Sequence, residues 1–409
     1  MKLARLAATC LLTSVLAVQP GCDTDDGADI PANQLRYHLE VELQPGAEVH
    51  RCQLVTTRDV ETFVVGGSHT YSPGSHHMLL FRTDLTSIPP ELAGVRDCYE
   101  GASSIMSHIR GLVYGAQKPQ DASDYPAGVG LPLGANEVLL MQAHYINATG
   151  AVMKATVDVI LKTGAAAEVQ QRAGSLFFYD PFISVPAGAA GRATMSCGIP
   201  SAVRLLTANS HMHKRGVGYR AFLDTPAARA TTPFYTTDSW DHPSQLAAPM
   251  DLAAGSIIRF ECDYQNTSQT PYFQGQSADS NEMCMFVGVY YPALTQADEF
   301  CTVGPHDFGT GSATCAQTLS CIQQCPPGTA PMVGVGGVGA TTMANVHECW
   351  QKCFADSCPA AWRPFAAQTK CVRTSCATEC ASPGSTECQS CALDRCGAEL
   401  NACFTSTCS

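Results

Sequence analysis

The chain has 409 residues, of which 45% are hydrophobic, so it can form two or three domains with sizeable cores. Its formal net charge of −12 comes with no basic tract that could neutralise phosphates, which argues against nucleic acid as a partner. Of its 22 cysteines, eight lie in residues 1–301 and fourteen in residues 315–408.

The N-terminus is typical of a secretory signal. In residues 1–22, Lys2 and Arg5 precede an apolar stretch that is too short for a permanent membrane span. Cys22 follows Gly21, which resembles a bacterial lipoprotein cleavage site. We therefore expect an extracytoplasmic protein, secreted or lipid-anchored at Cys22, with disulfides as the default state of its cysteines.

Short strands are expected from the end of a linker at residues 23–33 up to residue 303. In "ATVDVILKT" (155–163), residues alternate between two faces, and glycine and proline punctuate the surrounding chain. This pattern favours an all-β fold of antiparallel sandwiches. A small, polar stretch at 162–174 predicts a boundary between one domain at 34–165 and another at 166–303.

The C-terminal region differs in composition. After a second linker at 304–314, residues 315–409 contain three cysteine pairs spaced four apart, which places both sulfurs of a pair on one helix face. The pairs are Cys321/Cys325, Cys349/Cys353 and Cys376/Cys380. Zinc binding is one interpretation of such clusters, but a small disulfide-rich helical module fits an oxidising compartment better.

Two stretches in the first half hold histidines that burial alone does not explain. His76 and His77 are adjacent, so both could reach one ion only if the strand is irregular or ends there. Gln142 and His144 share a face when residues 138–147 are read as a strand. A single such histidine is usually a hydrogen-bonded core residue.

Two further stretches lie in the second half. His211 and His213 are two residues apart, so both rings leave the same face of a strand, which is good chelate spacing. Met283 precedes Cys284 in "SNEMCMFVGVYYP" (280–292). Alone, Met283 would be explained by core packing.

Taken together and in this order, the four stretches resemble the copper type II, ascorbate-dependent monooxygenases, a family that includes dopamine-hydroxylating and peptide-amidating enzymes. The resemblance covers residues 34–302 and leaves out the cysteine-rich region. It implies two tandem, jelly-roll-like β-sandwich copper domains with one copper each, facing one another across an open cleft.

The resemblance also implies the roles of individual residues. Electron-transfer copper would bind His76, His77 and His144. Oxygen-activating copper would bind His211, His213 and Met283, where a soft thioether favours Cu(I). Gln142 would help to order the path between the two sites. The implied reaction inserts one atom of dioxygen into a C–H bond of a small molecule, with ascorbate or a similar one-electron reductant.

Further implications concern disulfides and substrate. The implied bridges are Cys52–Cys98, Cys197–Cys301 and Cys262–Cys284. The peptide-amidating enzyme has an arginine where this chain has Asn209, so a carboxylate clamp is not expected. By the same comparison Met285 and Val287 replace polar residues, which implies a more apolar substrate pocket.

Two alternatives are weighed against this interpretation. An iron oxygenase could use His211, His213 and Glu282, but it leaves the three histidines of the first half unexplained. A secreted copper-binding or adhesion protein could retain the same scaffold and ligands without turnover.

Overall fold

The computed structural model describes residues 31–100, 105–180, 183–225, 228–301, 311–325, 349–350, 353–354, 356–376, 378–381 and 385–408. The expected signal at 1–22, Cys22 and most of both expected linkers lie outside these residues. Within the described part of the chain, no helix has the length and apolar character needed to cross a bilayer.

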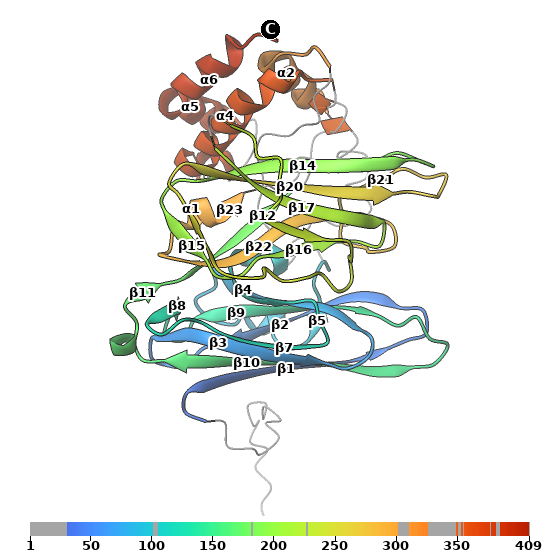
Figure 1. Cartoon of the computed structure of the whole chain (residues 1–409), viewed down its shortest axis with the longest axis vertical. Helices are drawn as coiled ribbons and strands as arrows, with labels where there is room; N and C mark the ends of the chain where they lie inside the picture. Colours follow the sequence, from blue (N-terminus) through green and yellow to red (C-terminus); the bar gives the residue numbers. More distant parts are fainter. Residues whose placement is uncertain are drawn as a thin grey trace, which may run out of the picture. The chain divides into compact units, whose positions relative to one another are not determined.

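Strands from the first half of the chain form two sheets (Figure 1). One sheet has the order β1-β10-β3-β8-β11, with β7 also paired to β3. Its strands are β1 (Gln34–Leu43), β3 (Thr62–Tyr71), β7 (Gln120–Asp124), β8 (Val129–Leu133), β10 (Met153–Gly164) and β11 (Gln171–Arg172). The other has the order β5-β2-β9-β4-β6. Its strands are β2 (Glu48–Thr56), β4 (Ser75–Thr83), β5 (Arg96–Asp97), β6 (Ile109–Ala116) and β9 (Val138–Ile146).

The second half forms a six-stranded sheet, a four-stranded sheet and a two-stranded ribbon. One sheet has the order β19-β15-β22-β12-β23, with β16 also paired to β22. It contains β12 (Gly174–Tyr179), β15 (Val203–Leu205), β16 (Asn209–Met212), β19 (Met250–Leu252), β22 (Cys284–Tyr291) and β23 (Phe300–Cys301). The second sheet, in the order β14-β20-β17-β18, contains β14 (Ala190–Ile199), β17 (Gly216–Asp224), β18 (Tyr235–Thr237) and β20 (Ser256–Gln265). The ribbon pairs β13 (Ser184–Val185) with β21 (Tyr272–Phe273).

Alternation along the strands explains where the cores form. In β10, Val157, Val159 and Leu161 are buried, whereas Asp158 and Ile160 between them are partly exposed. The buried faces of both first-half sheets contribute to one hydrophobic cluster, and the second half has a cluster of its own. The expectation of a mainly antiparallel β fold is therefore confirmed, and so is the disulfide-rich helical region after it.

The stretch at 162–174, where the sequence predicts a boundary, spans the end of β10, all of β11 and the start of β12. β11 lies after the 165/166 boundary that the sequence predicts, and it pairs with β8 of the first half. The second half begins with β12 at Gly174. The parallel pairing of β11 is a non-local contact that composition does not reveal.

The helices in the described part of the C-terminal region are α2 (Cys315–Gln323), α4 (Trp362–Ser375), α5 (Thr386–Arg395) and α6 (Gly397–Phe404). A four-residue helix, α1 (Gln296–Glu299), precedes β23. Short 3-10 turns occur at Pro90–Leu92, Ile105–His108, Ala166–Glu168, Pro359–Ala361 and Glu379–Ala381. All fourteen cysteines of the region are paired with one another. The bridges are Cys315–Cys403, Cys321–Cys353, Cys325–Cys349, Cys358–Cys408, Cys371–Cys396, Cys376–Cys391 and Cys380–Cys388. These sulfurs are thus unavailable to zinc.

The β region holds the three disulfides that the resemblance implied: Cys52–Cys98, Cys197–Cys301 and Cys262–Cys284. The last bridge fixes the start of β22 next to Met283. Bridges of this number indicate an oxidising, extracytoplasmic environment.

Candidate metal centre

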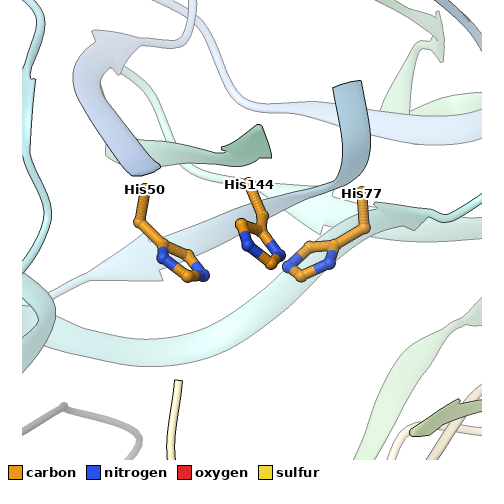
Figure 2. A group of neighbouring side chains, drawn as sticks. All are labelled: His50, His77 and His144. Atoms are coloured by element: carbon orange, nitrogen blue, oxygen red, sulfur yellow. The ribbon is translucent and has the colours of Figure 1, made fainter. Parts of the chain in front are cut away.

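Three histidines form a row across three neighbouring strands of the first half. His144 on β9 lies opposite His50 on β2 and opposite His77 on β4. Directly opposed residues point to the same face of a sheet, so all three rings meet there. Figure 2 shows the rings side by side, and their ligand nitrogens lie within 4.8 Å of one another.

A β-bulge brings His76 to the same face. The pairing of β4 with β9 shifts between Ser75 and His77, so an extra residue is inserted at this point. As a result the Nδ1 atoms of His76 and His77 are 3.1 Å apart, and each ring centroid lies 5.1–5.2 Å from that of His144. The strand irregularity that adjacent histidines would require is therefore confirmed.

The second group lies on one face of the β16–β22 pair. Asn209 is opposite Val287 and His211 is opposite Met285. Extending this register by one residue beyond the Met212–Cys284 pair places His213 opposite Met283, on the same face as His211. The ring centroids of His211 and His213 are 5.3 Å apart.

Hydrogen bonds fix one nitrogen of several rings and leave the other free. His144 Nε2 donates to Glu48 Oε1 (2.9 Å), and His213 Nδ1 donates to the Asn281 carbonyl (3.2 Å). His211 Nδ1 donates to Gln117 Oε1 (2.8 Å). These acceptors set the tautomers, because a carboxylate or carbonyl oxygen can only accept.

Three buried ring nitrogens have no hydrogen-bond partner among the described residues: His76 Nε2, His144 Nδ1 and His213 Nε2. A buried polar atom without a partner costs about 1–3 kcal/mol, so three in one cluster are costly to the apo protein. Imidazole nitrogens with free lone pairs are good ligands for copper or zinc. The residues present thus fit a metal ion.

Burial keeps these imidazoles neutral. Desolvation lowers the pKa of His76 to about 4 and holds the pKa values of His77, His144, His211 and His213 well below 6.5. The neighbouring histidines lower several of these pKa values further. A neutral ring can bind a metal without first losing a proton.

The two groups of histidines are close to each other, which differs from the open cleft that the resemblance implied. The ring centroids of His77 and His211 are 4.8 Å apart, and those of His76 and His211 are 6.3 Å apart. The side chain of Gln117, which follows β6, reaches His211 in the second half. A hydrophobic cluster with members in both halves closes this interface, among them Phe81, Phe177 and Met283.

A cavity of about 210 Å³ borders both groups. His77, His211 and Met283 line it, together with Gln142. Its other walls are largely aromatic and aliphatic, and include Leu79, Phe81, Tyr99, Phe177 and Tyr179. The three residues expected at the substrate pocket, Asn209, Met285 and Val287, also line it. The space next to both groups of histidines is therefore lined mainly by apolar surface.

Gln142 and Glu282, two further residues that the sequence points to, each form a hydrogen bond to a neighbouring side chain. Gln142 Nε2 donates to the hydroxyl of Tyr99 (3.1 Å), which in turn donates to Gln276 Oε1 in the second half (2.6 Å). Glu282 is fully buried and its Oε1 accepts from Arg215 Nη1 (3.1 Å). One oxygen of the carboxylate required by the iron interpretation thus has a structural partner, and the other, Oε2, is buried with no partner among the described residues.

Sequence reasoning missed His50 and Glu48. The ring of His50 stacks on that of His144, with centroids 4.0 Å apart and planes 10° from parallel. His50, His144 and His77 are the three histidines whose ligand nitrogens lie within 4.8 Å of one another, and His76 is outside that group. The sequence signal was weak: His50 shares a strand face with Cys52, but which strand lies alongside depends on non-local pairing.

Comparisons with known proteins show no family. No family model matches the chain, and no curated protein matches it. Weak structural matches include the major capsid protein P2 of bacteriophage PM2, with a TM-score of 0.24 and 8% identity over 64% of this chain and 98% of that chain. Another is a structure of Sulfolobus turreted icosahedral virus, with a TM-score of 0.18 and 9% identity over 63% and 57%. TM-scores this low do not establish a shared fold.

Proposed function

We propose that this chain is a copper-dependent monooxygenase built on two tandem, jelly-roll-like sandwiches. The first ligand set would be His76, His77 and His144, and the second would be His211, His213 and Met283. The observation that carries the proposal is the mainly apolar cavity that touches His77 from one set and both His211 and Met283 from the other. A substrate there would lie against both sets.

The chemistry of the donors supports copper. Imidazole suits copper in both oxidation states, and the thioether of Met283 favours the reduced state at the second set. Bound copper would supply one-electron chemistry and dioxygen binding. Each turnover would use one dioxygen, two electrons from a reductant such as ascorbate and two protons, giving a hydroxylated substrate and one water.

The protein's own contribution would be placement and exclusion of water. Three histidine rings are held by a hydrogen bond from one ring nitrogen. His144 donates to Glu48, His213 to the Asn281 carbonyl and His211 to Gln117. The apolar cavity walls would orient a C–H bond and keep water from the reacting atoms. Gln142 and Tyr99 form a hydrogen-bonded connection to Gln276 across the interface and would order the region between the two sets.

Copper analysis combined with oxygen uptake tests the proposal. The purified, copper-reconstituted protein should hold two coppers per chain and consume oxygen with ascorbate when given a suitable member of a panel of aromatic amines, alkyl amines and hydrocarbons. Two coppers without any ascorbate-dependent turnover would favour the secreted copper-binding or adhesion protein. A stoichiometry near one, or zinc retained against copper, would contradict the two-site arrangement.

A further inference from the structure

The carboxylate of Glu48 contacts a ligand of the first set, His144, and also the loop that leads to Met283 of the second set. Glu48 is the first residue of β2 in the first half. Its Oε1 accepts from His144 Nε2 (2.9 Å) and from the Ala278 amide (2.6 Å), and its Oε2 accepts from Ser277 Oγ (2.9 Å). Ser277 and Ala278 belong to the second half and precede Met283.

The contacts of Ser277 lead on to the second ligand set. The amide of Asn281 donates to the Ser277 carbonyl (2.9 Å), and the carbonyl of Asn281 accepts from His213 Nδ1 (3.2 Å). Met283 follows two residues later. The loop that Glu48 holds therefore sets the tautomer of one second-set ligand and leads directly into another.

Glu48 also determines which nitrogen of His144 can bind a metal. A carboxylate accepts only, so His144 Nε2 must carry a proton and Nδ1 must keep its lone pair. That Nδ1 is one of the three buried nitrogens without a partner. Partners of this kind orient metal-binding histidines and raise their basicity.

We propose that Glu48 is a positioning residue shared by both ligand sets, which orients His144 and at the same time clamps the loop that carries Asn281 and Met283. This inference rests on the proposed function, because it concerns the same metal sites. Its consequence is that removing one charge in the first half weakens metal binding in both halves.

Glu48→Gln tests this with little change in size. Affinity for Cu(I) would be measured by competition with a chromophoric chelator in two single-site backgrounds. His77→Ala keeps the set with Met283, and His211→Ala keeps the set with His144. We expect Glu48→Gln to lower the copper affinity about 10–100-fold in each background, the range typical of lost partners of metal ligands.

Glu137→Gln is the matched control. The side chain of Glu137 is 18% exposed and that of Glu48 is 19% exposed. Glu137 also forms a strong ion pair, with Arg82, but the pair lies within the first half and contacts neither ligand set. It should leave both copper affinities unchanged even where it lowers the melting temperature of the apo protein.

X-ray absorption adds a readout that a purely structural role would not alter. Reduced Glu48→Gln in the His77→Ala background should show a weaker copper–sulfur signal, because the loop before Met283 is no longer held. If affinity falls only in the His211→Ala background, Glu48 serves His144 alone and the shared role is wrong. If the parent protein binds two coppers and Glu48→Gln matches it, this inference fails while the proposed function stands. If the parent binds no copper, the proposed function itself fails.

Discussion

At the scale of single residues, Met283 separates packing from metal binding most sharply. It is 8% exposed in a hydrophobic cluster, so a packing role would let isoleucine replace it at a cost below about 1.5 kcal/mol. A hydrocarbon cannot donate a lone pair to a metal. We therefore expect Met283→Ile to fold, to keep copper at His76, His77 and His144, and to lose most oxygen insertion.

X-ray absorption of the reduced protein checks this expectation. The parent should show a sulfur scatterer at copper that Met283→Ile lacks. The same variant should bind copper only weakly at the remaining pair of imidazoles, His211 and His213. Normal turnover by Met283→Ile, with no sulfur at copper in the parent, would make Met283 a core residue.

His144 allows a second test at this scale. It is fully buried, but one of its ring nitrogens has no partner, so it contributes less to the apo fold than a fully bonded histidine would. We expect His144→Ala to remove one copper and most turnover and to leave the fold intact, as measured by metal analysis and circular dichroism. His69→Ala is the control for copper content, because both His69 nitrogens are bonded, to Tyr114 and to the Lys118 carbonyl. Two coppers retained in His144→Ala would contradict its assignment.

At the scale of elements, the β16–β22 pair determines which substrates can be held. Its cavity face carries Asn209, Met285 and Val287, which offer no positive charge. Of the residues described around the cavity none is an arginine, and Lys118 lies 4.0 Å from Asp121. We expect no useful amidation of glycine-extended peptides, because a buried carboxylate needs a charge-assisted partner worth about 1.5–3 kcal/mol.

Assay with a glycine-extended peptide and detection of the amide by mass spectrometry would check this. Asn209→Arg is an informative companion, because it adds the missing charge at the position where the peptide-amidating enzyme has arginine. Amidation by the parent at the rate of a dedicated enzyme would refute the expectation.

The same elements show what the sequence could and could not reveal. Period-two alternation identified β10, and two-residue spacing placed His211 and His213 on one face, because both patterns are local. The bulge next to His76 could be stated only as a condition, since it depends on the partner strand. The pairing of β2 with β9, which brings His50 and Glu48 to His144, joins residues almost a hundred positions apart, and a single sequence carries no record of such pairings.

At the scale of the whole molecule, the neutral histidines make the apo protein sensitive to acid. Their folded pKa values lie below 6.5, the value expected for an unfolded chain, so the unfolded state binds more protons as pH falls. This contribution to the free energy of unfolding is complete above pH 6.5 and is lost as pH falls toward about 4. Each histidine that stays neutral should cost on the order of 1–2 kcal/mol between pH 7 and pH 5.

Glu282 acts in the opposite direction. Burial raises its pKa to about 7, so its contribution is present below its usual value of 4.5 and is lost as pH rises through 7. One carboxyl group opposes several histidines, so we expect a clear net loss of stability on acidification. Calorimetry of the metal-free protein at pH 7 and pH 5 measures it, and an unchanged melting temperature would contradict the neutral cluster.

The cysteine-rich region should be separable from the rest of the chain. Its cysteines pair only with one another, and Lys370 forms an exposed ion pair with Asp298 of the preceding region. An exposed pair of this kind contributes about 0–1 kcal/mol. We expect deletion of residues 310–409 to leave copper binding and oxygenase activity largely in place. A loss of copper in the truncated protein would show that the region supports the sites.

The nested bridges of that region have a consequence for its behaviour toward proteases. Cys321–Cys353 and Cys325–Cys349 both enclose residues 326–348. A single backbone cut anywhere in that stretch would leave the two pieces covalently joined, and the nicked chain would migrate as one band until it is reduced. Insertions between Cys325 and Cys349 should also be tolerated, because lengthening a loop that a disulfide closes costs little additional entropy.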